Sequence, residues 1–425
     1  MEKKQYPLQN NYLSKKTFLL EKYNYFILLS IVFGGFLIFG LSENIKGPAI
    51  PEIQTDFHLD EGQLGFLLAL NSLGYLLACL FTSALSNKIG IRWTGSIAFA
   101  SMAIAGLCMY MSSTYTFLSM SYFLLYIGNG MLEIGLGIMA ARIFTKNTGM
   151  MMNLAHFFYG LSSTVAPIFA SSMMQWNITN GEIGWRGMYV IMLTFSLLPI
   201  LPSLLAKFPE EISQEEEKVS YRYLFRDPVA WLIVAILSCG IVSELGIGSW
   251  LVHFLVKAYN WNLKDASGML SMFFLFFMLA RLFLGPLTDK IGYTFSILIF
   301  SAFSGICSIL AIVVGEGGAI LFAIAGIGIA PIYPTIMALL SKRYPNGTGT
   351  AITFTVTFMG IASVIGNLFI GYIIDAVNSF FSTRGGEKEL IGLQAGYIFI
   401  GILALVCSVC CLILFITLRK KHAVL

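Results

Sequence analysis

Two acidic residues occupy matching places in long apolar stretches of this sequence. Glu43 lies in FGLSENIKGPAI, and Glu244 lies in CGIVSELGIGSW. A carboxylate in the middle of a membrane-spanning helix costs roughly 2.5–3.5 kcal/mol on insertion scales, so two of them at equivalent points indicate a function. They could bind a solute, bind protons, or flank an axis that relates two halves of the molecule.

A third carboxyl group, that of Glu133, follows Asn129 by four residues inside another long apolar segment. This spacing puts both side chains on one face of a helix, so we expect them to point into one cavity. A buried carboxyl group that loses and regains a proton couples transport to a proton gradient. We predict Glu133 as the leading proton-coupling residue and Glu43 and Glu244 as further ones. The alternative is a protonated Glu133 that only bonds neighbouring helices.

A polar patch is expected around Glu133. Asn153 and His156 are three residues apart on one face of the next segment along the chain, which a short turn connects to that of Asn129. Amide and imidazole groups both donate and accept hydrogen bonds, which suits hydroxyl-rich ligands. We therefore predict that Asn129, Asn153 and His156 bind substrate, although a lone buried histidine is as often a core residue.

Further substrate contacts are predicted at Trp250, Tyr333 and Asn367. The indole offers a stacking surface for a sugar ring, and the other two offer hydrogen bonds. Bonding between helices is the alternative for Tyr333, Asn367 and the similar Asn71. His253 is expected near the outer end of its helix, at the membrane interface.

The composition indicates an integral membrane protein. Of 425 residues, 57% are hydrophobic and 11% are charged, and the mean hydropathy is +0.79. About twelve segments are long enough to cross the bilayer as helices, and their continuous apolarity argues against a barrel. They lie near residues 25–46, 62–85, 93–112, 116–144, 150–174, 187–206, 228–256, 265–287, 294–314, 317–341, 349–377 and 395–418.

The seven cysteines all lie in apolar segments, so neither a disulfide framework nor a metal site is expected. Alternation of the loops puts 19 lysines and arginines on one side and 6 on the other, and Arg281 inside a helix. The positive-inside rule then predicts that both termini are cytoplasmic, in the cell inner (plasma) membrane. The expected parts are a tail 1–22, a bundle 23–206, a linker 207–227, a bundle 228–418 and a tail 419–425.

The two bundles are predicted to be parallel repeats. A shift of 201 residues brings Glu43 onto Glu244, and a shift of 202 brings Gly90 onto Gly292. A drift of one residue over this length makes a tandem repeat credible, and both copies begin on the same side.

The turn GPLTDKIG (285–292) is similar to the Gly-x-Leu-Ala-Asp-Arg/Lys-x-Gly turn of the major facilitator superfamily. The first copy, SALSNKIGIR (83–92), departs from it at Ser83 and Asn87. Within the superfamily the chain resembles the fucose permease branch in GNGMLE (128–133), NLAHFFYG (153–160) and GIAPIYPT (328–335). The resemblance covers the whole chain and implies an all-α membrane protein of twelve transmembrane helices in two six-helix bundles.

The resemblance also implies gating residues at the cytoplasmic face. Asn87 and Arg92 lie in the first turn, and Asp289 and Lys290 lie in the second. Glycines are expected to let helices approach closely there. Arg281, one helical turn before Gly285, is expected to pair near that end as part of the gate.

The leading interpretation is a secondary active transporter, a proton-coupled symporter of a sugar or similar neutral polyhydroxy solute that works by alternating access. Sodium coupling stays open, because carboxylates also bind Na⁺. The alternatives are a drug or metabolite/proton antiporter, a carrier of lipids, organic acids or nucleosides, and, far behind these, a membrane sensor or enzyme. We expect no cofactor and no nucleic acid, and a monomer in the lipid bilayer with a small-molecule solute as its partner.

Overall fold

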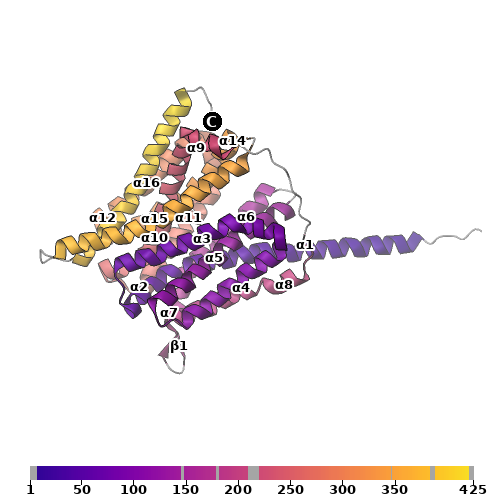
Figure 1. Ribbon diagram of the computed structural model, residues 1–425, viewed down its shortest axis with the longest axis horizontal. Coiled ribbons are helices and arrows are strands. Elements are labelled where there is room, and N and C mark those ends of the chain that lie inside the picture. Colours follow the sequence, from indigo (N-terminus) through magenta and orange to yellow (C-terminus); the bar gives the residue numbers. More distant parts are fainter. Residues whose placement is uncertain are drawn as a thin grey trace, which may run out of the picture.

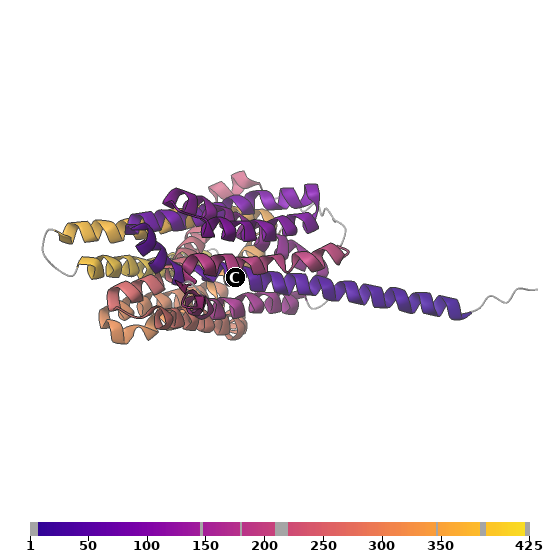
Figure 2. The same ribbon diagram turned by 90° about the horizontal axis from the view of Figure 1, so that it is seen from below.

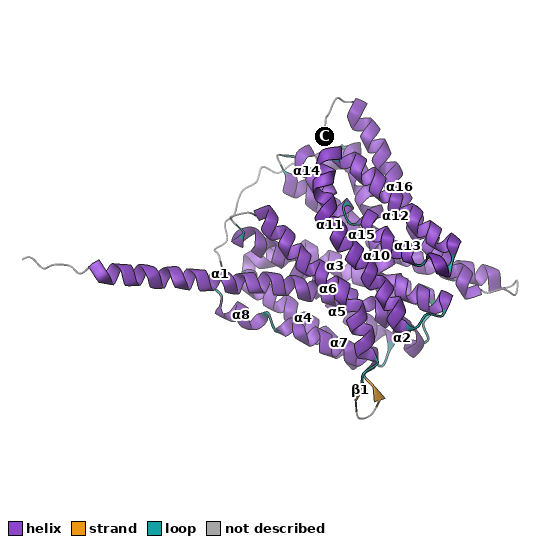
Figure 3. Cartoon of the chain, turned by 180° about the vertical axis from the view of Figure 1, so that it is seen from behind, coloured by secondary structure: helices purple, strands orange, loops and turns teal. Residues whose placement is uncertain are grey.

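The computed structural model describes residues 7–144, 148–178, 181–208, 220–345, 347–382 and 388–420. Side chains are described from residue 22 onward, with gaps that include Asn153. The described chain is nearly all helical, and Figure 3 shows one short hairpin among the helices. It pairs β1 (Asn177–Ile178) with β2 (Gly181–Glu182) in antiparallel fashion.

The helices fall into two groups, one from each half of the chain. The first group contains α1 (Pro7–Asn44), α2 (Lys46–Phe57), α3 (Glu61–Ile89), α4 (Ile91–Tyr110), α5 (Tyr115–Ile143), α6 (Thr148–Met174), α7 (Gly184–Thr194), the 3₁₀ turn η1 (Phe195–Leu197) and α8 (Ile200–Leu205). The second contains α9 (Tyr221–Arg226), α10 (Pro228–Tyr259), α11 (Leu263–Ile291), α12 (Tyr293–Val314), the 3₁₀ turn η2 (Glu316–Gly318), α13 (Ile320–Ile329), α14 (Ile332–Arg343), α15 (Thr348–Ser382) and α16 (Lys388–Lys420).

In the described residues, 11 helical segments are long and apolar enough to cross a membrane. The 27-residue helix α6 takes the place of the remaining predicted span. The prediction of an all-α membrane protein is therefore confirmed. Its first span is longer than predicted, because α2 continues it as far as Phe57.

Figure 1 shows that the two bundles lie side by side and diverge toward one side of the molecule. That side holds the start of α1, which projects far beyond the other helices (Figure 2), and the end of α16. We call it the terminal side. The bundles converge on the opposite side, near α2 and the end of α10, which we call the distal side.

Prolines explain the breaks in two spans. A proline within a helix cannot donate to the carbonyl four residues before it and clashes with that carbonyl. Pro48 therefore separates α1 from α2 at Ile45, beside Glu43. Pro334 likewise cannot donate to Ala330, where α13 gives way to α14. Both breaks place irregular backbone inside the protein, as membrane proteins require.

Two glycine turns confirm the repeat in backbone geometry. Gly90 joins α3 to α4 with φ 84° and ψ 153°, and Gly292 joins α11 to α12 with φ 90° and ψ 145°. Only glycine adopts this conformation without strain. At Gly285, by contrast, an added Cβ would meet no atom within 4 Å, so the expected close approach of helices does not occur there.

Close contact between the bundles occurs instead along α3 and α15. A Cβ on Gly371 would lie 2.4 Å from the carbonyl oxygen of Glu61 and 2.9 Å from the Cα of Gly65. Asp375 accepts hydrogen bonds from the backbone N–H groups of Glu61 at 3.2 Å and Gly62 at 2.5 Å. The carboxylate thus satisfies donors at the start of α3 that have no partner within their own helix.

The α3–α15 contact makes a testable prediction. Gly371→Val should lower the apparent unfolding midpoint of the purified protein, since overpacking at backbone contact typically costs about 1–3 kcal/mol. Gly34→Ala is the matched control, because no atom lies within 4 Å of a Cβ there. Equal midpoints for both variants would show that the bundles do not meet at Gly371.

Candidate functional site: a polar cavity between the bundles

A cavity of about 160 Å³ lies between the two bundles. It is far larger than the roughly 10–15 Å³ needed to hold one water molecule. All three predicted proton-coupling residues, Glu43, Glu133 and Glu244, line it, and so do the cations Lys46 and Arg281. The three carboxyl groups thus share one space with the two cations.

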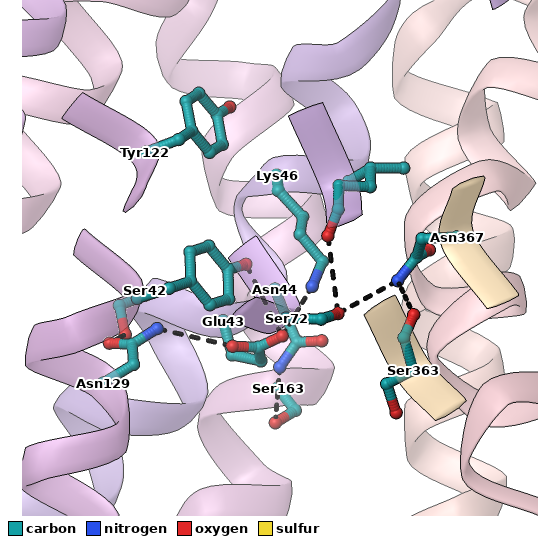
Figure 4. Close-up of polar contacts among 12 residues, drawn as sticks. Ser42, Glu43, Asn44, Lys46, Ser72, Tyr122, Asn129, Ser163, Ser363 and Asn367 are labelled. Carbon is teal, nitrogen blue, oxygen red and sulfur yellow. Dashed lines mark hydrogen bonds and ion pairs between the residues drawn. The ribbon is translucent and has the colours of Figure 1, made fainter. Parts of the chain in front are cut away.

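Glu43 is held in a network of its own at the end of α1. Its Oε1 lies 2.5 Å from Lys46 Nζ, and both side chains are largely buried. Asn129 Nδ2 donates to Glu43 Oε2 at 3.3 Å and its Oδ1 accepts from Ser42 at 2.8 Å, as Figure 4 shows. Asn129 is fully buried and lies behind Glu43. It therefore positions Glu43 and does not line the cavity, contrary to our expectation.

Glu133 and Glu244 are less compensated. The Tyr75 hydroxyl donates to Glu133 Oε2 from α3. Glu244, on α10, has no hydrogen bond or ion pair within the part of the chain that the structure describes, and it faces the cavity. Neither carboxylate has the direct lysine partner that Glu43 has.

Arg281 lies in the cavity wall, not at the gate predicted from the sequence. Its Nε donates to the Ala330 carbonyl at 3.2 Å, and its guanidinium lies 4.2 Å from the Phe277 ring centroid. The Ala330 carbonyl is free because Pro334 has no N–H to donate to it. The helix break between α13 and α14 thus holds Arg281 in the wall of the cavity that the three carboxylates line. Arg281 makes no ion pair among the described residues.

The predicted substrate-binding residues divide into two sets. His156, Tyr333 and Asn367 line the cavity. Trp250 does not: it is 1% exposed and packs in the core, with its ring 5.8 Å from that of His253. The stacking role predicted for Trp250 finds no support in this arrangement. The side chain of Asn153 lies outside the described residues.

The predicted gating residues other than Arg281 do lie at the terminal side. Arg92 donates to the carbonyl of Ala206, which ties α4 to the end of α8. Asp289 accepts from Tyr293 at 3.0 Å and makes no ion pair with an arginine in the described chain. Asn87 and Lys290 are exposed. Their gating role stays a prediction.

The distal side is closed by a buried pair that the sequence did not predict. His253 Nε2, on α10, lies 3.0 and 3.1 Å from the carboxylate oxygens of Glu61, on α3. Gln54 donates to the same carboxylate at 2.9 Å. His253 is fully buried, so the expectation that it lies at the membrane interface is wrong. Its partner Glu61 is 192 residues away in the sequence, so no local sequence pattern predicts the pair.

Sequence reasoning also missed cavity residues of other kinds. Lys46 pairs with Glu43 at the i,i+3 spacing, a signal that could have been used. Tyr75 and Tyr126 also face the cavity. A tyrosine in an apolar helix is typical of a core residue, so these two carried no usable signal.

Two helical bundles around a polar central cavity define a membrane transporter. The family model for the Major Facilitator Superfamily matches residues 32–366, and the chain belongs to this family. The resemblance noted from the sequence is thus confirmed at the level of the superfamily.

Individual relatives are distant. The protein is 21% identical to a Protein TsgA homolog of Buchnera aphidicola, over 85% of this chain and 92% of that protein. A bacterial homologue of the human lysosomal transporter Spinster, inward-facing and unoccupied, superposes with a TM-score of 0.78 at 14% identity, over 94% and 98% of the two chains. The Escherichia coli fucose:proton symporter gives 0.63 at 15% identity, over 92% and 99%. These structures share the fold.

The Glu43–Lys46 pair yields a double-mutant test. Lys46→Met should destabilise the protein by about 3 kcal/mol, because it leaves a buried carboxylate without its counter-charge. Adding Glu43→Gln should restore most of that loss, and Lys88→Met at an exposed turn is the control. The cycle is measured by the apparent unfolding midpoints of the unaltered protein, Lys46→Met, Glu43→Gln and the double variant, with Lys88→Met beside them. Strictly additive effects would mean that the two groups are not paired.

Proposed function

We propose that this protein is a cation-coupled symporter of a small neutral polyhydroxy solute, with a proton as the coupling ion. The observation that carries the proposal is the charge of the cavity wall. Three carboxylates, Glu43, Glu133 and Glu244, face two cations, Lys46 and Arg281. With every acid ionised and His156 neutral, one negative charge is left over.

An excess charge opposes closure of the cavity. Taking an unpaired carboxylate out of water costs several kcal/mol, so in this proposal the transition of the solute-loaded cavity through a closed state needs a counter-charge. A proton or a sodium ion that binds from one side and leaves on the other provides it. The cavity is then neutral when loaded, and it carries the excess charge when it faces water.

Glu133 fits the role of the proton carrier best. It accepts from the Tyr75 hydroxyl of α3 and has no lysine or arginine bonded to it in the described residues. Glu43 is already paired with Lys46, so its charge is compensated without a coupling ion. Glu244 is the second candidate, because no described group compensates it.

Alternating access follows from the arrangement of the bundles. The distal side is sealed by Glu61 with His253 and by Asp375 with the start of α3. The excess of lysine and arginine on the terminal side supports placing that side in the cytoplasm. The cell inner (plasma) membrane as the location and the monomer as the working unit are part of the proposal. This state then faces inward. A proton that enters down about 100 mV supplies about 2.3 kcal/mol, enough for roughly fifty-fold accumulation.

A second cargo is favoured by one observation. Arg281 faces the cavity and makes no ion pair within the described chain. An organic acid would bind it through its carboxylate. The same transport assay separates this candidate, as well as antiport of a drug or metabolite, from symport of a neutral solute.

Purified protein in proteoliposomes tests the proposal. With an inward proton gradient and a panel of sugars, polyols and organic acids, we expect accumulation of a neutral polyhydroxy solute. Glu133→Gln should abolish accumulation and retain counterflow exchange, because exchange does not need the proton to leave. Glu182→Gln, on the exposed hairpin, is the control. Undiminished accumulation by Glu133→Gln would contradict the assignment of Glu133 as the proton carrier. Accumulation that depends on a sodium gradient would identify Na⁺, and not the proton, as the coupling ion.

A further inference from the structure

The side chain of Asn71 is buried without a partner in the cavity wall. It lies on α3, is 2% exposed and lines the cavity. Among the buried amide side chains in the described part of the chain, it is the one whose nitrogen and oxygen both lack a hydrogen bond. Buried polar groups nearly always have partners, so an amide that faces a cavity with both atoms free points to a ligand.

Asn367 faces the same cavity from α15 in the other bundle. Its Nδ2 donates to the Ser72 hydroxyl and to the Ser363 carbonyl, both at 3.1 Å (Figure 4). A carbonyl can only accept, which fixes the orientation of this amide. Its Oδ1 is left buried and without a partner.

The helices that carry the two amides touch between the bundles. Ser72, which Asn367 contacts, directly follows Asn71 in α3. The backbones are close as well, because a Cβ on Gly65 would lie 2.8 Å from the Asn367 carbonyl oxygen. The free atoms therefore face one cavity from two helices in contact, α3 and α15.

We propose that Asn71 and Asn367 form a subsite that binds two hydroxyl groups of the transported solute and bridges the two bundles. The inference rests on the proposed symport function and specifies its ligand. The two free amide oxygens each accept from a hydroxyl, and Asn71 Nδ2 donates back to a hydroxyl oxygen. Hydroxyl groups satisfy both demands because each donates and accepts.

The unpaired atoms of the two amides discriminate between cargoes. A carboxylate has no hydrogen to give to either amide oxygen, so an organic acid without hydroxyl groups leaves both unpaired. A sugar or polyol with neighbouring hydroxyl groups leaves neither unpaired. Because one amide comes from each bundle, such a solute also links the bundles at the contact that must change when they rock.

The binding test uses L-fucose, D-xylose and D-mannitol with their singly deoxygenated analogues, on the full-length protein. Asn71→Leu, similar in volume but without the amide, should weaken binding of the preferred compound about tenfold or more. The deoxygenated analogue with the weakest binding to the unaltered protein should bind the Asn71→Leu variant with the same affinity. Unchanged binding and uptake in Asn71→Leu overturns the subsite and leaves symport standing. If the unaltered protein accumulates no panel member under any gradient, the proposed function fails, and the subsite loses its ligand with it.

An unfolding measurement without ligand tests the same subsite when binding is too weak to measure. Asn71→Leu removes an unpaired amide, so the apparent unfolding midpoint without ligand should stay constant or rise. Asn44→Leu is the matched control: this amide is also buried but bonds to Gly40 and Ser163, so its loss should lower the midpoint. An equal fall in both variants would mean that Asn71 has structural partners, which overturns the proposal.

Discussion

The cost of removing charge from water governs this structure. Carboxylates in a low-dielectric interior must meet a cation, a hydrogen-bond donor or a proton. Glu43 has Lys46 at 2.5 Å and Glu61 has His253 at 3.0 Å, and both pairs are buried. Glu133 has only the Tyr75 hydroxyl, and Glu244 has no partner among the described residues. The difference separates carboxylates that hold the structure together from those available for transport.

The helix breaks supply the remaining parts of the site. Pro48 accompanies the end of α1 just after Glu43, and Lys46, at the start of α2, lines the cavity beside it. Pro334 frees the Ala330 carbonyl, which then holds Arg281. In both cases a proline, which is costly in a helix interior, creates a local irregularity of the backbone. The irregular backbone lies inside the protein, where its polar groups find partners.

Much of the fold could be predicted from the sequence, because apolar runs of membrane length leave few alternatives. The repeat was visible in the spacing of Glu43 and Glu244 and of Gly90 and Gly292, and the two glycines share one backbone conformation. The repeat related Glu43 to Glu244, and the spacing of Glu133 from Asn129 indicated a third carboxyl group that faces a cavity. These features depend on periodicity along the chain, which a single sequence records.

Side-chain partners across the fold could not be predicted in this way. Asn129 turns from the cavity toward Glu43, and Arg281 is fixed by a carbonyl 49 residues away. His253 meets Glu61 on the other bundle. Each outcome depends on how helices rotate and pack, and neither hydropathy nor spacing specifies rotation. The likeness to known structures establishes the fold. It does not establish these side-chain contacts, which depend on the residues of this chain.

The reversal potential of solute flux in proteoliposomes tests the central claim most directly. One uncompensated carboxylate predicts that one coupling cation moves with each neutral solute. The potential that stops net flux should then shift with the cation gradient as a one-to-one stoichiometry requires. A solute flux that ignores both membrane potential and cation gradient would contradict this mechanism, because the cavity would then close without a counter-charge.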